Sequence, residues 1–272
     1  MSTGEEVVVS ALAQNTRDVF FQYDADYIAN YHNLSPFNLK ANSELQLSPK
    51  KPHGGLYGIF ADSLPDGWGR LLQDRVFRQQ GISVHEITAM DRLAFVGDRG
   101  MGALSYKPMS DYIPCDEYDV SLANLGLEAQ AVFNGQTDEV FAQLVAAGSS
   151  GGARPKVQLY FAKGDFAHCR TYEKAGDEAW LVKFTSKNLP LGHDEGLCES
   201  IYLTLAKMAD LDPPEWRLID APAQSGAKAW IALKRFDWVS NGVSGPSGRL
   251  VMHSACGLLD TDFSKIRRKP SP

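Results

Sequence analysis

A glycine-rich stretch constrains this sequence more than any other feature. Residues 148–156 read GSSGGARPK and run directly into the β-branched and aromatic segment VQLYFA. Glycines lack a Cβ, so their backbone N–H groups can approach phosphate oxygens closely, and a nearby lysine adds positive charge. The same composition also forms ordinary turns between two elements. The loop by itself therefore leaves a phosphate-binding and a purely structural interpretation open.

The segment after the loop narrows the phosphate-binding alternatives. Walker A loops and dinucleotide-binding loops both open a helix, whereas Lys156 here leads into a strand-like run. Protein kinases instead place a glycine-rich flap ahead of a strand, with a lysine on a later strand and a glutamate on the next helix. Lys183 in WLVKFTS and Glu199 in the following helical pattern supply both groups. Either residue alone is typical of a solvated surface, so the indication comes from the ordered set of three.

Composition and charge exclude several classes of protein. The chain has 272 residues, enough for two packed units, and a formal net charge of -6, which offers no basic surface for direct nucleic-acid binding. No apolar run approaches the roughly 20 residues of a membrane span. The N-terminus MSTGEEVVVS has acids where a secretory signal has bases, so we expect a cytoplasmic protein without a membrane segment. The four cysteines form no C-x-x-C pair, and we expect no metal site.

Residues 1–110 are predicted to form a first unit. Strand patterns occur in VVVSALA, DVFFQYD, ELQLS and GALSYKP, and helical patterns in LPDGWGRLLQDRVFRQQG and HEITAMDRLAFVG. Asp66 is the candidate N-cap of the first of these helices. Acids, polar residues and proline accumulate without period in MSDYIPCDEYD at 109–119, which is where we expect the boundary.

Residues 111–272 are predicted to form a second unit. Two helical patterns, LANLGLEAQAVFNG and DEVFAQLVAAG, lead into the glycine loop. Strand patterns follow in KVQLYFA, EAWLVKFTS, EWRLIDA and AWIALKRF. Residues 194–210 are predicted to be a helix with Leu197, Ile201, Leu205 and Met208 on one face. The whole pattern predicts an α+β protein.

Six segments, in order along the chain, resemble the signatures of one known family. They are SLPDGWGR (63–70), RLAFVGDRGMGAL (92–104), SSGGARPK (149–156), WLVKFTS (180–186), CESIYLTLAKMADL (198–211) and IALKRFDW (231–238). Together they resemble HipA-type serine/threonine kinases, the toxins of bacterial persistence modules. The resemblance runs from about residue 8 to about residue 263. It implies a small N-terminal α/β subdomain followed by a protein-kinase-like N-lobe.

The resemblance also implies roles for individual residues. The implied phosphate loop contains Ser149, Ser150, Gly151, Gly152, Ala153 and Lys156. Lys183 would contact the ATP phosphates, oriented by Glu199, and the hinge beside adenine would be Ala232, Leu233, Lys234 and Arg235. Ser149 and Ser150 are the candidates for autophosphorylation. Lys234 stands where the family often has an acid. The implied cofactors are ATP and Mg²⁺.

The resemblance further implies partners. The usual partner in the family is a small helix-turn-helix antitoxin, and the implied substrate is a protein of the translation-factor or tRNA-synthetase type, such as glutamyl-tRNA synthetase.

The sequence departs from the family in one important respect. A HipA-type kinase needs a catalytic aspartate in a D-x-H-x-x-N-like segment and a second aspartate for Mg²⁺, both well after Arg235-Phe236-Asp237. Asp260 and Asp262 stand too early for these roles, and no such segment is present. We therefore expect the C-lobe to be largely absent, no catalytic residue and no phosphoryl transfer by this chain alone, and weak ATP binding. The alternative is a non-catalytic binding or regulatory module derived from a HipA kinase.

Overall fold

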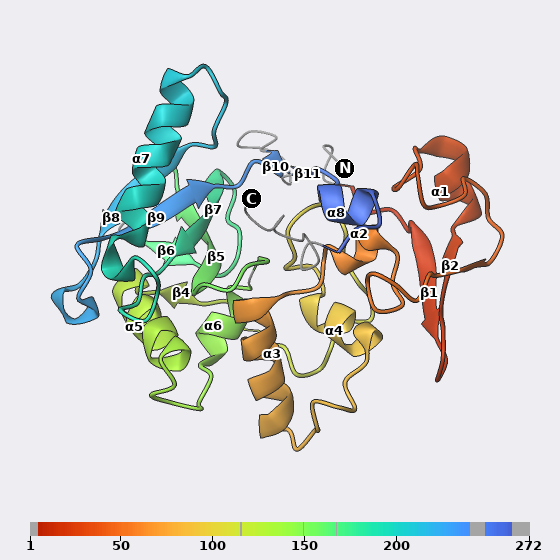
Figure 1. Cartoon of the computed structure of the whole chain (residues 1–272), viewed down its shortest axis with the longest axis horizontal. Coiled ribbons are helices and arrows are strands. Elements are labelled where there is room, and N and C mark those ends of the chain that lie inside the picture. Colours follow the sequence, from red (N-terminus) through yellow and green to blue (C-terminus); the bar gives the residue numbers. More distant parts are fainter. Residues whose placement is uncertain (1–4, 115, 149, 167, 240–247, 263–272) are drawn as a thin grey trace, which may run out of the picture.

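The computed structural model describes residues 5–114, 116–148, 150–166, 168–239 and 248–262. Within these ranges the chain is a mixed α+β protein built on antiparallel sheets, as the sequence predicts. Figure 1 shows a large sheet with its helices on one side of the molecule and a small sheet on the other. Helices α3 and α4 lie between them. No helix in the described ranges is both long and apolar enough to cross a membrane.

The N-terminal unit is built around aromatic side chains. Phe21 and Tyr23 of β2 pack with Tyr57 and Phe60 in one buried cluster, which also contains Leu93. Hydrogen bonds pair β1 with β2 and β2 with β3, both antiparallel. The elements of this unit are β1 (Ser10–Gln14), β2 (Val19–Tyr23), α1 (Ala25–Asn30), β3 (Gln46–Leu47), α2 (Gly58–Ala61), α3 (Gly67–Gln79) and α4 (Ala89–Val96).

The larger unit is an antiparallel sheet of six strands in the described part of the chain, in the order β4-β6-β5-β7-β9-β8. Its elements are β4 (Asp119–Val120), α5 (Leu122–Phe133), α6 (Ala142–Ala146), β5 (Lys156–Ala162), β6 (Cys169–Arg170), β7 (Asp177–Lys183), α7 (Glu195–Met208), β8 (Trp216–Asp220) and β9 (Ala229–Lys234). The central β5–β7 pair runs from Lys156 opposite Lys183 to Ala162 opposite Asp177. This register brings the start of β5 beside the end of β7.

The two units share core residues through α3. Trp68, Leu72 and Val76 of this helix belong to the same buried cluster as Val157 and Trp180 of the large sheet. The indole of Trp68 is 1% exposed. A helix that precedes the predicted boundary at residue 110 therefore packs into the core of the second unit, while the boundary itself stays a prediction.

The end of the described chain returns to the N-terminal unit. After β10 (Trp238–Val239) and β11 (Gly248–Arg249), the helix α8 (Ala255–Leu258) lies beside α2. Asp62 accepts hydrogen bonds from the backbone N–H and the hydroxyl of Ser254, at 2.6 and 2.7 Å, and its carboxylate lies 2.8 Å from Nδ1 of His253. The first and last described segments are thus held together by polar contacts.

Most predicted elements are confirmed, and one expectation needs correction. The segment GALSYKP contains no strand: the Gly102 N–H donates to the Asp237 carboxylate and the Tyr106 N–H to the Gly97 carbonyl, so these groups are not available to a sheet. The apolar face of α7 exists, but the described residues leave it largely uncovered. Ile201 is 57% exposed and Met208 is 77% exposed.

Candidate functional site

An ion pair joins the large sheet to helix α7. Lys183 is the last residue of β7, and its Nζ lies 2.5 Å from Oε1 of Glu199 on α7. The two side chains are 25% and 30% exposed. The pair is therefore fixed in position yet remains open to solvent, which suits an amine that takes a ligand as a further partner.

The glycine loop ends beside this pair. Lys156 begins β5 directly opposite Lys183, and its Nζ donates to the Gly151 carbonyl at 2.9 Å. Burial, together with the positive charge of Lys183, lowers the pKa of Lys156 to about 8. The Lys156 side chain thus lies against the glycine-rich backbone, and Lys183 lies opposite it on the neighbouring strand. Ser149 lies outside the described residues.

The loop is held by residues from two other elements. The carboxylate of Asp66 accepts a hydrogen bond from the Gly152 N–H, and the Trp68 N–H donates to the Gly152 carbonyl at 3.2 Å. On the other side, Arg154 lies 2.9 Å from Glu195 in the first turn of α7. The loop thus spans the space between the start of α3 and the start of α7.

The predicted hinge, Ala232 to Arg235, consists of the last three residues of β9 and the residue after it. Ala232 and Leu233 pair with β7 on one side and β8 on the other. The N–H groups of Lys234 and Arg235 donate to the carbonyls of Glu215 and Ala179. These two donors are therefore occupied by the protein, and contact with adenine stays a prediction.

Lys234 of the predicted hinge is paired with acids. Its Nζ lies 2.6 Å from Glu178 and 3.5 Å from Glu215. Although partial burial lowers the pKa of Lys234, the hydrogen bond to Glu178 and the two negative charges outweigh it and raise the pKa. The Lys234 side chain thus has its charge partners within the protein.

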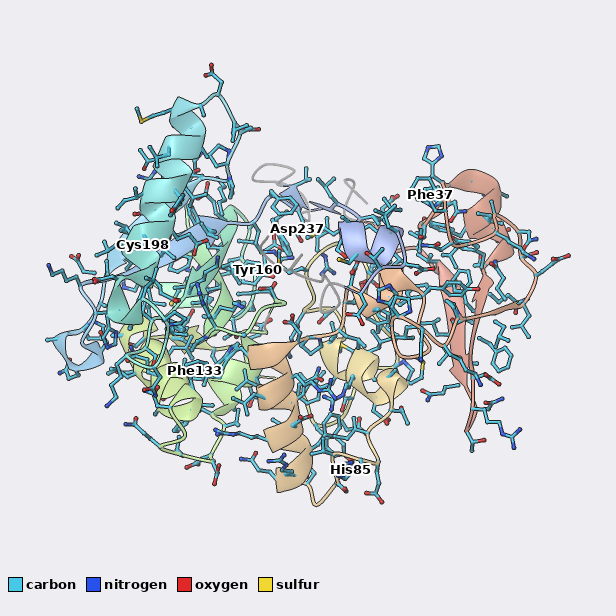
Figure 2. The ribbon with its side chains drawn as sticks, viewed as in Figure 1. Phe37, His85, Phe133, Tyr160, Cys198 and Asp237 are labelled. Carbon is cyan, nitrogen blue, oxygen red and sulfur yellow. The ribbon has the colours of Figure 1, made fainter. Side chains whose placement is uncertain are left out.

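Arg235 turns into the junction between the two units instead of toward the loop. Its Nε and Nη2 donate to the two carboxylate oxygens of Asp237, at 3.0 and 2.6 Å, and Nη1 donates to Gln158. Asp237 also accepts the Gly102 N–H at 2.7 Å, and Nη2 of Arg235 contacts the Gly100 carbonyl at 3.3 Å. In Figure 2 Asp237 lies between the sheet and the N-terminal unit. The Arg-Phe-Asp segment therefore fastens the loop at 100–102.

The arrangement provides the kinds of donor that recognise phosphate groups. Glycine-rich backbone and two adjacent lysines match the donors that recognise phosphate oxygens. Among the described residues no group of three or more His, Cys, Asp or Glu side chains could hold a metal ion. The donors present thus fit the phosphates of ATP.

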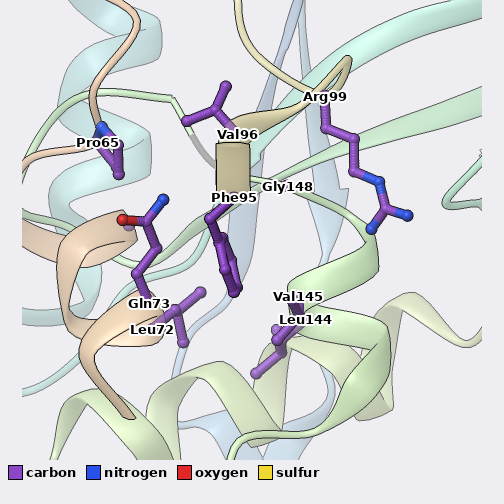
Figure 3. A pocket seen from close by; sticks show the side chains of 10 residues that line it. Pro65, Leu72, Gln73, Phe95, Val96, Arg99, Leu144, Val145 and Gly148 are labelled. Atoms are coloured by element: carbon purple, nitrogen blue, oxygen red, sulfur yellow. The ribbon is translucent and has the colours of Figure 1, made fainter. Parts of the chain in front are cut away.

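A pocket beside the loop is too small for a nucleotide. Figure 3 shows it between α3, α4 and α6, and it reaches Gly148 at the start of the glycine loop. Its volume is about 40 Å³, whereas ligand pockets typically occupy roughly 300–1,000 Å³. Apolar side chains such as Leu72, Phe95 and Leu144 line it. We interpret it as a packing gap between helices.

Comparisons with known proteins agree with this architecture. The family model described as HipA N-terminal domain matches residues 4–107, and the model described as HipA-like C-terminal domain matches residues 148–269. The chain is a HipA-type protein. A search of curated proteins found no match.

A solved structure is similar over nearly the whole chain. It is described as the Shewanella oneidensis MR-1 toxin antitoxin system HipA, HipB and its operator DNA complex. The TM-score is 0.60 at 16% sequence identity, and the match covers 94% of this chain and 55% of the other. The chain thus spans about half the length of the HipA chain it matches. At this identity the similarity supports the fold.

The structure brings together most of the residues singled out in the sequence. Lys156, Lys183 and Glu199 meet beside the glycine loop, while Arg235 lies apart in the junction. Sequence reasoning missed the contact of Asp66 and Trp68 with the loop. Both residues belong to the segment LPDGWGR, which carried the family resemblance, but nothing in the pattern relates that segment to the loop more than 80 residues later.

Proposed function

We propose that this HipA-type chain binds the phosphates of ATP between its glycine loop and the Lys183–Glu199 pair, as the N-lobe of a protein serine/threonine kinase does. The observation that carries the proposal is this pair, at 2.5 Å, next to the loop that precedes β5. A strand lysine paired with a helix glutamate is the arrangement by which kinases position the α- and β-phosphates.

Binding is expected to be weak. The described residues supply phosphate donors but no cluster of three or more His, Cys, Asp or Glu side chains for a metal ion, and part of a kinase nucleotide site comes from the metal and the aspartate that holds it. Ordering a glycine-rich loop also opposes binding. We expect a dissociation constant no tighter than roughly 1 mM, or about 4 kcal/mol of binding free energy.

Calorimetric titration with ATP tests this proposal. The chain is expected to bind at roughly millimolar affinity, and Lys183→Met, which keeps most of the aliphatic side chain but removes the charge, is expected to give no measurable heat. Lys187→Met, in the turn after β7, is a matched control that removes a lysine with no ion pair to Glu199. Absence of binding by the unaltered chain, or equal binding by Lys183→Met, would refute the proposal.

Phosphoryl transfer is expected to require residues that this sequence does not contain. No D-x-H-x-x-N-like segment follows Asp237, so the general base and the metal-binding aspartate have no counterpart. Incubation with ATP and Mg²⁺ should leave Ser149 and Ser150 unmodified by intact-mass measurement. Phosphate on either serine that disappears in Lys183→Met would contradict this expectation.

The partner is proposed to be a helix-turn-helix antitoxin. The similar solved structure contains HipA together with HipB and operator DNA, and the N-terminal unit matched by the HipA N-terminal model is present here. A protein substrate of the tRNA-synthetase or translation-factor type is proposed by family membership alone. The alternative, a non-catalytic binding module, would retain antitoxin binding when Lys183→Met removes nucleotide binding.

A further inference from the structure

The segment Asp66-Gly67-Trp68 is hydrogen-bonded to the glycine loop, although the two are far apart in the sequence. Asp66 accepts the Gly152 N–H, and the Trp68 N–H donates to the Gly152 carbonyl. The indole N–H of Trp68 donates to the Lys156 carbonyl at 2.8 Å. Both peptide groups of Gly152 and the end of the loop are therefore bound by one short segment that begins α3.

The side chain of Asp66 does not cap the helix that it precedes. Asp66 occupies the N-cap position of α3 with extended backbone, yet it makes no capping hydrogen bond to the helix. Aspartate at this position normally accepts an N–H from the first turn. Asp24, for comparison, caps α1 by accepting from Asp26 and Tyr27. The carboxylate of Asp66 instead reaches the Gly152 N–H.

The backbone geometry of the contact is restrictive. Gly152 has a φ of +106° and Gly67 a φ of +37°, which side chains on L residues rarely allow. A Cβ at Gly67 would collide with the backbone of Ala153. The two backbones thus approach closely, and Trp68, which is 1% exposed, anchors this contact in the core.

We propose that Asp66 is a positioning residue for nucleotide binding, which holds Gly152 in the bent conformation that presents the loop to phosphate. The inference rests on the proposed function, because it assigns a role within that site. A free loop with three glycines loses much conformational freedom when it closes on a ligand. The contact with Asp66 orders the loop before the ligand arrives, so less of the binding free energy is lost.

Two variants separate the hydrogen bond from the residue that makes it. Asp66→Ala removes the acceptor and is expected to weaken ATP binding about tenfold, as measured by ligand-detected NMR titration. Asp66→Asn keeps an acceptor oxygen in place and is expected to stay within about threefold of the unaltered chain. Asp24→Ala, which removes a true N-cap far from the loop, is expected to leave ATP binding unchanged.

Amide hydrogen exchange provides a measurement without nucleotide. Exchange in residues 150–156 is expected to accelerate in Asp66→Ala and to stay slow in Asp66→Asn, with thermal stability recorded for each variant. If the unaltered chain binds no ATP, the proposed function fails, and exchange then decides only whether Asp66 orders the glycine loop. Unchanged exchange in Asp66→Ala would overturn the inference, as would tighter ATP binding by that variant, which would make Asp66 a competitor of phosphate.

Discussion

Two ion pairs in this molecule each join a basic and an acidic side chain, but one is partly exposed to solvent and the other is buried. Lys183 and Glu199 meet through a single contact of 2.5 Å, with side chains 25% and 30% exposed. Arg235 and Asp237 meet through two hydrogen bonds, with side chains 2% and 0% exposed. Further partners, Gln158, Gly100 and Gly102, complete the second pair.

The difference separates a binding role from a structural one. A buried, fully hydrogen-bonded pair has no capacity left for a ligand, and removing one partner leaves a charge in the protein interior. A partly exposed pair with a single contact contributes little to stability, and its lysine can take phosphate oxygens as additional partners. The Arg-Phe-Asp segment therefore belongs to the framework, and Lys183 to the candidate site.

The largest effect is expected from breaking the buried pair. Asp237→Ala leaves the Arg235 guanidinium without its main partner and should lower the free energy of unfolding by about 3–5 kcal/mol. Chemical denaturation measures this loss. Lys183→Ala should cost no more than about 1 kcal/mol in the same assay. Equal losses for the two variants would remove the distinction between the pairs.

The next largest effect is expected in the pH dependence of nucleotide binding. The pKa of Lys156 is lowered to about 8 by burial and by the charge of Lys183, and bound phosphate favours the charged amine. Above pH 8 the free amine is neutral, so binding takes up a proton and the dissociation constant should rise by up to about tenfold per pH unit. Affinity should be constant below that range.

ATP titrations from about pH 7 to about pH 9.5 check this dependence. Lys156→Arg keeps its charge throughout and should bind without the rise above pH 8. Affinity of the unaltered chain that stays constant through this range would show that the Lys156 amine does not meet phosphate.

The smallest effect is expected at Lys234. Its pair with Glu178 lies at 2.6 Å, but the lysine side chain is 37% exposed. Lys234→Ala should lower the free energy of unfolding by about 0.2–1 kcal/mol and leave ATP binding unaltered. A larger loss of unfolding free energy, measured by chemical denaturation in parallel with Asp237→Ala, would show that Lys234 has a structural role like that of the Arg235–Asp237 pair.

Local patterns predicted the elements around the candidate site well. The strand-like runs containing Lys156 and Lys183 and the helix containing Glu199 all form, because alternation and helical spacing of apolar residues are local properties. The order of glycine loop, lysine and glutamate in the sequence then identified residues that lie close together in the structure. The register that places Lys156 opposite Lys183 follows from the antiparallel β5–β7 pair.

Contacts between distant segments could not be predicted in this way. Asp66 resembled a helix cap in the sequence, and its diversion to Gly152 depends on how α3 packs against the loop. GALSYKP has the alternation of a strand, but the Gly102 N–H is taken by Asp237. The apolar residues along one face of α7 correctly predicted a helix. The pattern could not predict that this face is exposed, because exposure depends on which other segments pack against it.

The central claim is that ligand binding engages the glycine loop and leaves the Arg235–Asp237 junction unchanged. Amide hydrogen exchange with and without about 10 mM ATP, some ten times the expected dissociation constant, tests it directly. The account predicts slower exchange in residues 150–156 and no change in residues 98–102. Protection of 98–102 with no change in the glycine loop would contradict it.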